Sequence, residues 1–214
     1  MHIELENVLP ADIERRSMEI IGGELPHPIP PEHEAVVKRV IHTTADFDYL
    51  DNLIFSYGAC AKGIEALKAG ATIVTDTNMA FSGVNKASCR KLGVEVRCFM
   101  ADEDVAAAAK ANGTTRATAS MDKAAALEGP VIFAIGNAPT ALVRLYELIR
   151  EGRLSPALII GVPVGFVNVV QSKELILSTD TPHIIARGRK GGSNVAAAIC
   201  NALLYQAAGR RMEE

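Results

Sequence analysis

Residues 131–150 read VIFAIGNAPTALVRLYELIR, and this stretch predicts the fold class. Its first five residues form a short apolar run rich in β-branched side chains, which favours a buried strand. Gly136 allows a tight turn, and Pro139 suits the first turn of a helix. A helix over 138–150 has one apolar stripe, formed by Ala141, Leu142, Leu145, Leu148 and Ile149. A strand that turns directly into an amphipathic helix is typical of a parallel α/β sheet.

Four further apolar runs predict the remaining strands of this sheet. They are Ala71–Val74, Val94–Met100, Leu158–Val164 and His183–Ala186. Helical stretches lie between the runs, and Gly113 ends the one at 102–112. Near-continuous apolar strands are buried on both faces, and alternation of strand and helix implies right-handed crossovers. We predict a doubly wound α/β domain with a mainly parallel, five-stranded sheet.

The first 55 residues differ from the rest of the chain. They predict helices near residues 11–21 and 32–44, joined by the proline-rich stretch PHPIPP at 26–31. The last predicted helix of the chain is Ala-rich and covers residues 191–206. The sequence contains no internal repeat. We predict one domain over 1–214, in which residues 1–55 form a helical extension.

Composition excludes several classes of protein. The 214 residues carry 22 Lys and Arg against 25 Asp and Glu, and 49% are hydrophobic, which excludes a disordered chain. A net charge of -3, with no Trp, argues against a nucleic-acid partner, because phosphates need a basic excess and bases need aromatic rings. Residues 1–34 hold eight acids and two bases, so the remainder is mildly basic.

The location of the protein is predicted to be cytoplasmic. The opening residues MHIELENVLP lack the pattern of a signal peptide, and the longest apolar run, 157–167, is too short for a membrane span. We therefore expect no membrane partner. Cys60, Cys89, Cys98 and Cys200 form no C-x-x-C pair, so they are expected to be buried thiols.

Three predicted strand exits have an unusual composition for simple turns. They are AIGNAPTAL at 134–142, GVPVGFVN at 161–168 and RGRKGGSN at 187–194. Ligands of open parallel sheets bind at the carboxyl ends of strands, and free N–H groups at a helix start attract anions. The first exit is therefore a candidate anion site. The third is either an anion site or a solvated basic turn, because no phosphate-loop motif is present.

His42 is the most informative single residue. Arg39 and His42 lie at i and i+3 of a predicted helix, on a face other than its apolar stripe. Such a pair is either an ordinary surface pair or a proton donor near neutral pH beside a fixed positive charge. Asp46, Asp48 and Asp51 follow closely, but their spacing predicts no metal site.

The assembled motifs resemble the precorrin-8X methylmutase family. The matching stretches cover most of the chain and are IERRSMEII (13–21), VVKRVIHTTADFD (36–48), TDTNMAFSGV (75–84), GTTRATAS (113–120), AIGNAPTAL (134–142), GVPVGFVNVVQSKELIL (161–177) and GRKGGSNVAAAICNAL (188–203). Only Asn168 departs from the expected pattern, where a small residue such as Gly is typical.

The resemblance implies a three-layer α/β/α, flavodoxin-like domain, a homodimer and no cofactor. It implies an isomerase that moves a methyl group from C11 to C12 of a contracted tetrapyrrole that bears many carboxylates. His42 matches the proton donor and acceptor of the family, and residues 1–55 contribute to the site. The substrate-binding residues implied are Ser17, Arg39, Thr43, Arg116, Asn137 and Lys190. The alternative is a non-catalytic tetrapyrrole carrier on the same fold, which needs charges but no proton donor.

Overall fold

The computed structural model describes residue 3 and residues 5–210, and within them six strands form one sheet. Residues 1, 2, 4 and 211–214, which the predicted single domain also includes, lie outside the described residues. The spatial order of the strands is β1-β6-β5-β4-β2-β3. Their bounds are β1 Leu53–Phe55, β2 Thr72–Thr75, β3 Glu95–Arg97, β4 Val131–Ile135, β5 Leu158–Gly161 and β6 His183–Ala186.

Strands β2 to β6 are parallel and have the order of a flavodoxin-like sheet. β2 pairs with both β3 and β4, and β5 and β6 then follow outward from β4. The direction in which the chain adds strands therefore reverses between β2 and β4. Sheets of this kind bind ligands at the carboxyl end of that reversal point.

The prediction of five strands is corrected to six, because β1 joins the sheet at its edge. β1 pairs antiparallel with β6, with Leu53 opposite Ala186. It has only three residues and directly follows the short helix α3 (Tyr49–Asn52), so no alternation is visible in its sequence. Residues 1–55 are therefore not purely helical, since their last three residues complete the sheet.

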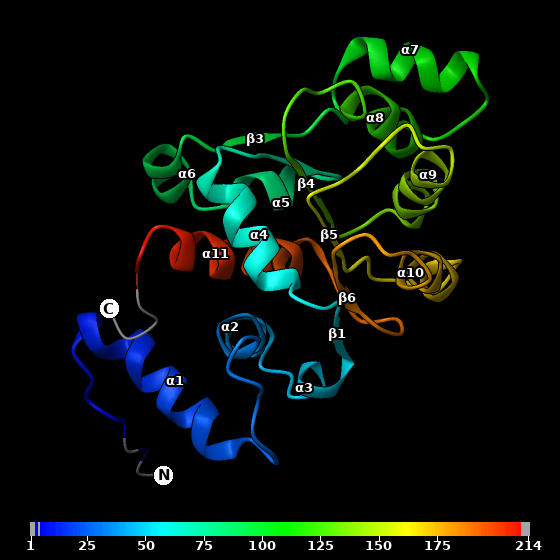
Figure 1. Ribbon diagram of the computed structural model, residues 1–214. Coiled ribbons are helices and arrows are strands. Elements are labelled where there is room, and N and C mark those ends of the chain that lie inside the picture. Colours follow the sequence, from blue (N-terminus) through cyan, green and yellow to red (C-terminus); the bar gives the residue numbers. More distant parts are fainter. Residues whose placement is uncertain (1–2, 4, 211–214) are drawn as a thin grey trace.

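Helices cover both faces of the sheet, which confirms the three layers (Figure 1). One face carries α4 (Ala59–Lys68), α5 (Asn78–Gly83), α6 (Lys86–Leu92) and α11 (Ser193–Ala207), with α2 (Glu34–Thr44) packed on α11. The other face carries α7 (Glu103–Ala111), α8 (Arg116–Ala124), α9 (Pro139–Arg150) and α10 (Val169–Leu177).

Each face of the sheet has its own hydrophobic core. β4 is buried along its whole length, and its side chains alternate between the two faces. Ile132 and Ala134 join the core under α4 and α11, whereas Phe133 and Ile135 join the core under α8 and α9. This double burial explains why the strand reads as an unbroken apolar run.

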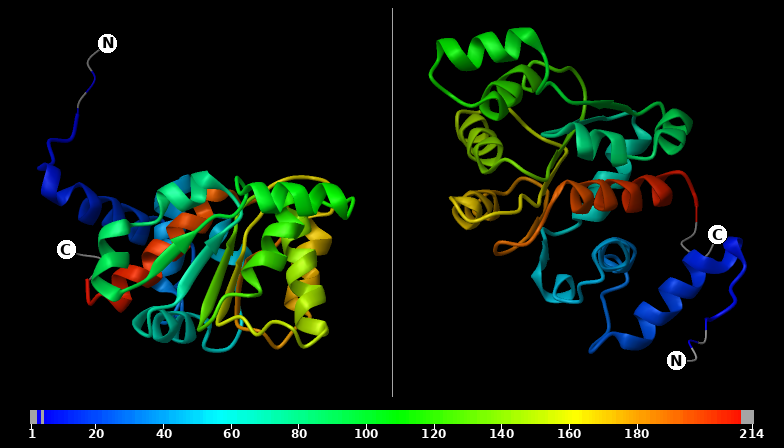
Figure 2. Two further views of the ribbon diagram at one scale, coloured as in Figure 1. Left: turned by 90° about the horizontal axis from the view of Figure 1, so that it is seen from above. Right: turned by 180° about the vertical axis from the view of Figure 1, so that it is seen from behind.

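The first long helix lies outside the three layers. A short 3-10 helix (Pro10–Asp12) leads into α1 (Ile13–Glu24), which packs on α2 through the buried side chains of Met18 and Ile21. Figure 2 shows the chain before α1 running away from the sheet. Within the described residues, no helix combines the length and the apolar character that crossing a membrane requires.

Candidate active site

The carboxyl ends of the parallel strands meet at one end of the sheet, and the segments that leave them build the candidate site. These segments are 76–77 after β2, 136–138 after β4, 162–168 after β5 and 187–192 after β6. Because β1 runs antiparallel to β6, the segment between α2 and β1 reaches the same end. Segments far apart in the sequence are therefore neighbours here.

A carboxylate of the protein itself occupies the point where the strand order reverses. Asp76 is fully buried and accepts hydrogen bonds from the backbone N–H groups of Gly136 at 2.8 Å, Asn137 at 2.8 Å and Ala138 at 2.6 Å. Burial raises the pKa of this carboxyl, while the three N–H donors act in the opposite direction. The predicted external anion site at the start of α9 is therefore wrong, because its N–H groups already have an anionic partner.

Gly191 and Gly192, in the turn RKGG at 189–192, bring together the segments that follow β5 and β6. A Cβ atom at position 191 would overlap the carbonyl oxygen of Val162, and the φ of +156° there also favours glycine. Gly192 donates its N–H to the same oxygen at 2.9 Å, and Gly165 donates to the carbonyl of Arg189 at 3.2 Å. Segments 162–168 and 187–192 therefore form one joined surface.

A buried lysine holds the backbone of segment 187–192 through hydrogen bonds. Lys173 in α10 is fully buried, and its Nζ donates to the carbonyl oxygens of Gly188 at 2.8 Å and Lys190 at 2.9 Å. Burial lowers the pKa of the Lys173 ammonium to about 8. The sequence analysis did not predict that Lys173 or Asp76 is buried. A single charged residue gives no periodic pattern from which its burial can be predicted.

Lys190 connects the RKGG turn to the end of α2. Its Nζ lies 2.6 Å from Oδ2 of Asp46 and 2.6 Å from Oδ2 of Asp48. The hydrogen bonds to Asp46 and Asp48 raise the pKa of Lys190, and the same bond to Lys190 lowers the pKa of Asp46. These contacts place the segment that carries His42 beside segment 187–192.

His42 and Ser17, two of the predicted site residues, line one hollow between α1 and α2. His42 is exposed in the last turn of α2, which ends at Ala45 in the left-handed conformation. The hollow measures about 250 Å³ and is walled mainly by apolar side chains; its remaining lining residues are Ile20, Ile21, Glu24, Ile41, Ala45 and Phe47. The imidazole is therefore accessible to a ligand at the rim of an apolar surface.

Arg39 lies one turn before His42 but does not line this hollow. Its Nη2 donates to Oε1 of Glu14 at 2.5 Å, and its guanidinium lies 5.2 Å from the ring centroid of Tyr205. Burial raises the pKa of the Glu14 carboxyl, but the hydrogen bond and charge of Arg39, with the charges of Arg210 and His42, leave that pKa below its usual value. Among the described residues, Nε of Arg39 is buried without a hydrogen-bond partner.

The three other predicted residues lie at different places around the carboxyl end. Thr43 is exposed beside His42 and donates its hydroxyl to the carbonyl of Arg39 at 2.9 Å. Asn137 is exposed after β4, on the backbone that Asp76 fixes. Arg116 is exposed at the start of α8. α2, which carries His42, and α8, which begins at Arg116, lie on opposite faces and toward opposite edges of the sheet (Figure 1), so the two residues of one chain do not share one helix face or loop.

Cysteines and acids in the described part of the chain form no metal centre. No three side chains of His, Cys, Asp or Glu gather closely enough to hold a metal ion in that part. All four cysteines there are free, and burial raises the pKa of Cys60 to about 11 and that of Cys200 to about 12. Thiols with such values are poor nucleophiles at neutral pH.

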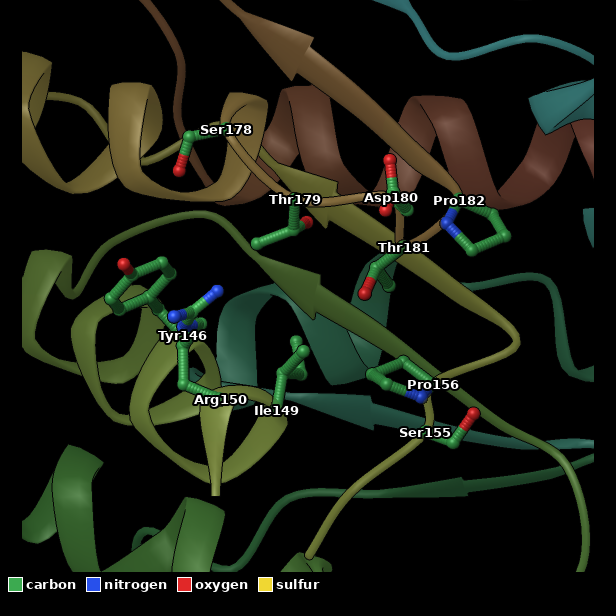
Figure 3. Close-up of a pocket in the computed structure, with 10 residues that line it drawn as sticks. All are labelled: Tyr146, Ile149, Arg150, Ser155, Pro156, Ser178, Thr179, Asp180, Thr181 and Pro182. Atoms are coloured by element: carbon green, nitrogen blue, oxygen red, sulfur yellow. The ribbon is translucent and has the colours of Figure 1, made fainter. Parts of the chain in front are cut away.

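A larger cleft, of about 480 Å³, lies at the opposite, amino end of the sheet (Figure 3). It is walled by the ends of α9 and α10 and by the segments that lead into β5 and β6, and it includes Arg150 and Asp180. None of the predicted site residues lines it. Because ligands of this fold bind at the carboxyl ends of strands, we place the candidate site at His42 and not in this cleft.

Comparisons with known proteins agree with the motifs. The family model for precorrin-8X methylmutase matches residues 12–206. The chain is 47% identical over 203 residues to cobalt-precorrin-8 methylmutase of Salmonella typhimurium, covering 92% of this chain and 95% of that protein. It is 44% identical over 178 residues to precorrin-8X methylmutase of Pseudomonas aeruginosa, covering 82% and 85%.

A solved structure agrees as well. The crystal structure of precorrin-8X methylmutase from Thermus thermophilus matches this fold with a TM-score of 0.85 at 42% identity, covering 92% of this chain and 96% of that one. Sequence and fold thus lead to the same group of enzymes, and the chain belongs to the precorrin-8X methylmutase family.

Proposed function

We propose that this protein moves a methyl group from C11 to C12 of precorrin-8X, or of cobalt-precorrin-8, to give hydrogenobyrinic or cobyrinic acid. Relatives named for each of the two substrates match most of the chain, which supports both forms. The observation that carries the assignment to this site is the exposed imidazole of His42 in an apolar-walled hollow at the carboxyl end of the sheet.

The chemistry requires position and a proton, and no external reagent. The imidazolium of His42 donates its proton to a ring nitrogen of the substrate, which withdraws electrons from the C11–C12 region. The bond from the methyl group to C11 then breaks as the bond to C12 forms, and the ring nitrogen returns its proton to His42. A well-positioned acid and base of this kind contributes about 10²–10⁴-fold.

Substrate binding is proposed to use polar side chains around the same end of the sheet. The residues are Ser17, Arg39, Thr43, Arg116, Asn137 and Lys190. Arg39 and Lys190 are already paired with carboxylates of the protein, those of Glu14 and of Asp46 and Asp48, so each would exchange such a partner for a carboxylate of the substrate. Arg116 is exposed at the start of a helix, where N–H groups add positive potential.

The protein is further proposed to act as a homodimer in the cytoplasm. A hollow of about 250 Å³ encloses only part of a contracted tetrapyrrole, and a second chain would enclose more of it. Ile13 and Ile20 of α1 are exposed, which suits a helix that packs against another copy. The four free thiols agree with a reducing compartment.

The test of this function is turnover by the wild type and by His42→Ala. The wild type should shift the absorption spectrum of precorrin-8X or cobalt-precorrin-8 over time. His42→Ala should bind the pigment but convert it about 10²–10⁴ times more slowly. His27→Ala, which removes an exposed histidine outside the hollow, is the control and should retain turnover. Full turnover by His42→Ala would refute the role of His42, whereas binding without turnover by the wild type would favour the carrier.

A further inference from the structure

An exposed aromatic ring and an exposed guanidinium lie together on the joined surface of segments 162–168 and 187–192. The side chain of Phe166 is 81% exposed, and its neighbours Val164 and Val167 are exposed as well. The guanidinium carbon of Arg189 lies 5.4 Å from the centroid of the Phe166 ring. Neighbouring apolar side chains that are exposed together are a feature of binding surfaces.

Arg189 differs from the cations on either side of it. Arg187 is paired with Glu174, and Lys190 is paired with Asp46 and Asp48. Within the described part of the chain, Arg189 forms no ion pair, and its guanidinium lies over the ring of Phe166. Its charge is therefore available to an external carboxylate.

The backbone beneath both side chains is fixed. Lys173 binds the carbonyl groups of Gly188 and Lys190, on the two sides of Arg189. The carbonyl of Arg189 itself accepts the N–H of Gly165, next to Phe166. A ligand that uses both side chains consequently does not have to order these segments first, which lowers the entropy cost of binding.

We propose that Phe166 and Arg189 form a substrate-binding pair, in which the ring packs on the flat tetrapyrrole and the guanidinium binds a carboxylate at its rim. This inference rests on the proposed function, because a flat, conjugated, polycarboxylate ligand combines the two chemistries that the pair offers. Aromatic faces stack on conjugated rings, and arginine binds carboxylates through paired N–H donors. The pair lies at the same end of the sheet as His42, beside Lys190.

The experiment compares Phe166→Ala and Arg189→Gln with the wild type in two assays. The first assay measures kcat and KM for methyl migration, and the second measures equilibrium binding of the product cobyrinic acid by its absorbance. We expect KM and the product Kd to rise about 3–10-fold for Phe166→Ala and about 10–100-fold for Arg189→Gln. The value of kcat should stay within about 3-fold, because neither group moves the proton. Phe166→Tyr should retain wild-type binding.

Matched controls are Tyr57→Ala and Arg153→Gln, which remove an exposed ring and an exposed guanidinium outside this surface. Both should leave KM unchanged. Unchanged KM and Kd in Phe166→Ala and Arg189→Gln would overturn the proposal while leaving the proposed function intact. Loss of the dimer on sedimentation of either variant would also overturn it, because the surface would then be a contact between copies. If the wild type binds cobyrinic acid but does not catalyse methyl migration, the proposed function is refuted. The binding assay then still tests the proposal for Phe166 and Arg189.

Discussion

Asp76 and Lys173 are two buried charges of opposite sign that shape the carboxyl end of the sheet. Asp76 gathers three N–H groups after β4, and Lys173 gathers two carbonyl groups after β6. In both cases the partners belong to the backbone, so each side chain fixes the path of a whole segment. Neither residue needs to touch the substrate to affect how the substrate is held.

Replacing Asp76 by Asn tests the first of these charges. The new NH₂ group would face backbone N–H donors, so at least one buried donor would lose its acceptor. We expect the free energy of unfolding to fall by about 2–3 kcal/mol in urea titrations. Asp180→Asn, at an exposed carboxylate, should change it by no more than about 0.5 kcal/mol. Equal losses in the two variants would contradict the role of Asp76.

The buried charge of Lys173 predicts that the free energy of unfolding changes with pH in the alkaline range. The pKa of Lys173 is about 8 in the folded chain and about 10.5 in the unfolded chain, so between these values the unfolded state binds more protons. The unfolding free energy contributed by Lys173 therefore rises as pH increases from 8 to 10.5, by about 3 kcal/mol in total. Below pH 8 the full cost of the buried charge is present.

Comparison with Lys173→Met separates the pH dependence due to Lys173 from that due to the cysteine thiols. Cys60 and Cys200 have raised pKa values, so their contribution falls above pH 9, in the opposite direction but equally in both proteins. We expect the unfolding free energy of the wild type to increase relative to Lys173→Met between pH 7.5 and pH 10. A constant difference over this range would mean that the ammonium is not buried.

Among the strands, those buried on both faces were predictable from sequence and the edge strand β1 was not. The apolar runs of β4 and β6 occur at their predicted bounds, because burial on both faces leaves an unbroken pattern. The run at Leu158–Val164 ends as a strand at Gly161, since Pro163 cannot continue the ladder. β1 has no pattern of its own, because pairing with β6 and not local sequence makes it a strand.

The attachment of α1 to α2 gives a prediction at the scale of elements. The Arg39 side chain is only 11% exposed and relies on Glu14 of α1. The lowered pKa of Glu14 means that this pair stabilises the docked helix above the ordinary pKa of a glutamate and loses that effect as pH falls through the lower, folded value. Glu14→Gln should therefore weaken docking at neutral pH by about 1 kcal/mol.

Amide hydrogen exchange measures this docking directly. The amides of α1 should exchange about 5-fold faster in Glu14→Gln than in the wild type, while those of β4 should not change. Glu19→Gln is the control, because Glu19 pairs only with Arg15 and Arg16 of the same helix in the described structure. Equal exchange of α1 in both variants would show that Glu14 does not hold the helix.

At the scale of the whole molecule, the proposed site residues come from both faces of the sheet. Ser17, Arg39, His42, Thr43 and Lys190 belong to the side of α1 and α2, and Asn137 follows the inner strand β4, whereas Arg116 begins α8 on the other face of the sheet. Their roles follow from the family resemblance, since spacing alone left His42 open between a surface pair and a proton donor. No pattern in the sequence showed that α2 and α8 lie on opposite faces.

Mixing two inactive variants tests whether two chains share one site. We expect the Arg116 that serves a given His42 to come from the partner chain, because the two residues of one chain lie on helices at opposite faces of the sheet. His42→Ala and Arg116→Gln should each be impaired alone. After the two variants are unfolded and refolded together, mixed copies of the proposed dimer should regain activity, because one of their two sites has both residues intact. The recovery should reach about a quarter of wild-type turnover per site, since about half of the refolded dimers are mixed.

The control for this mixture is His42→Ala refolded with itself at the same concentration, which should remain impaired. Absence of recovery in mixed samples that sedimentation shows to be dimeric would place His42 and Arg116 of a site on one chain.

The position of Asp76 has a consequence for which metabolites compete with the substrate. In other proteins with this strand order, the crevice at the reversal point receives a nucleotide or phosphate. Here the carboxylate of Asp76 already accepts hydrogen bonds from the three N–H groups that would otherwise bind a phosphate. We therefore expect cellular nucleotides to compete poorly with the substrate at that crevice, although the scaffold is one that commonly binds them.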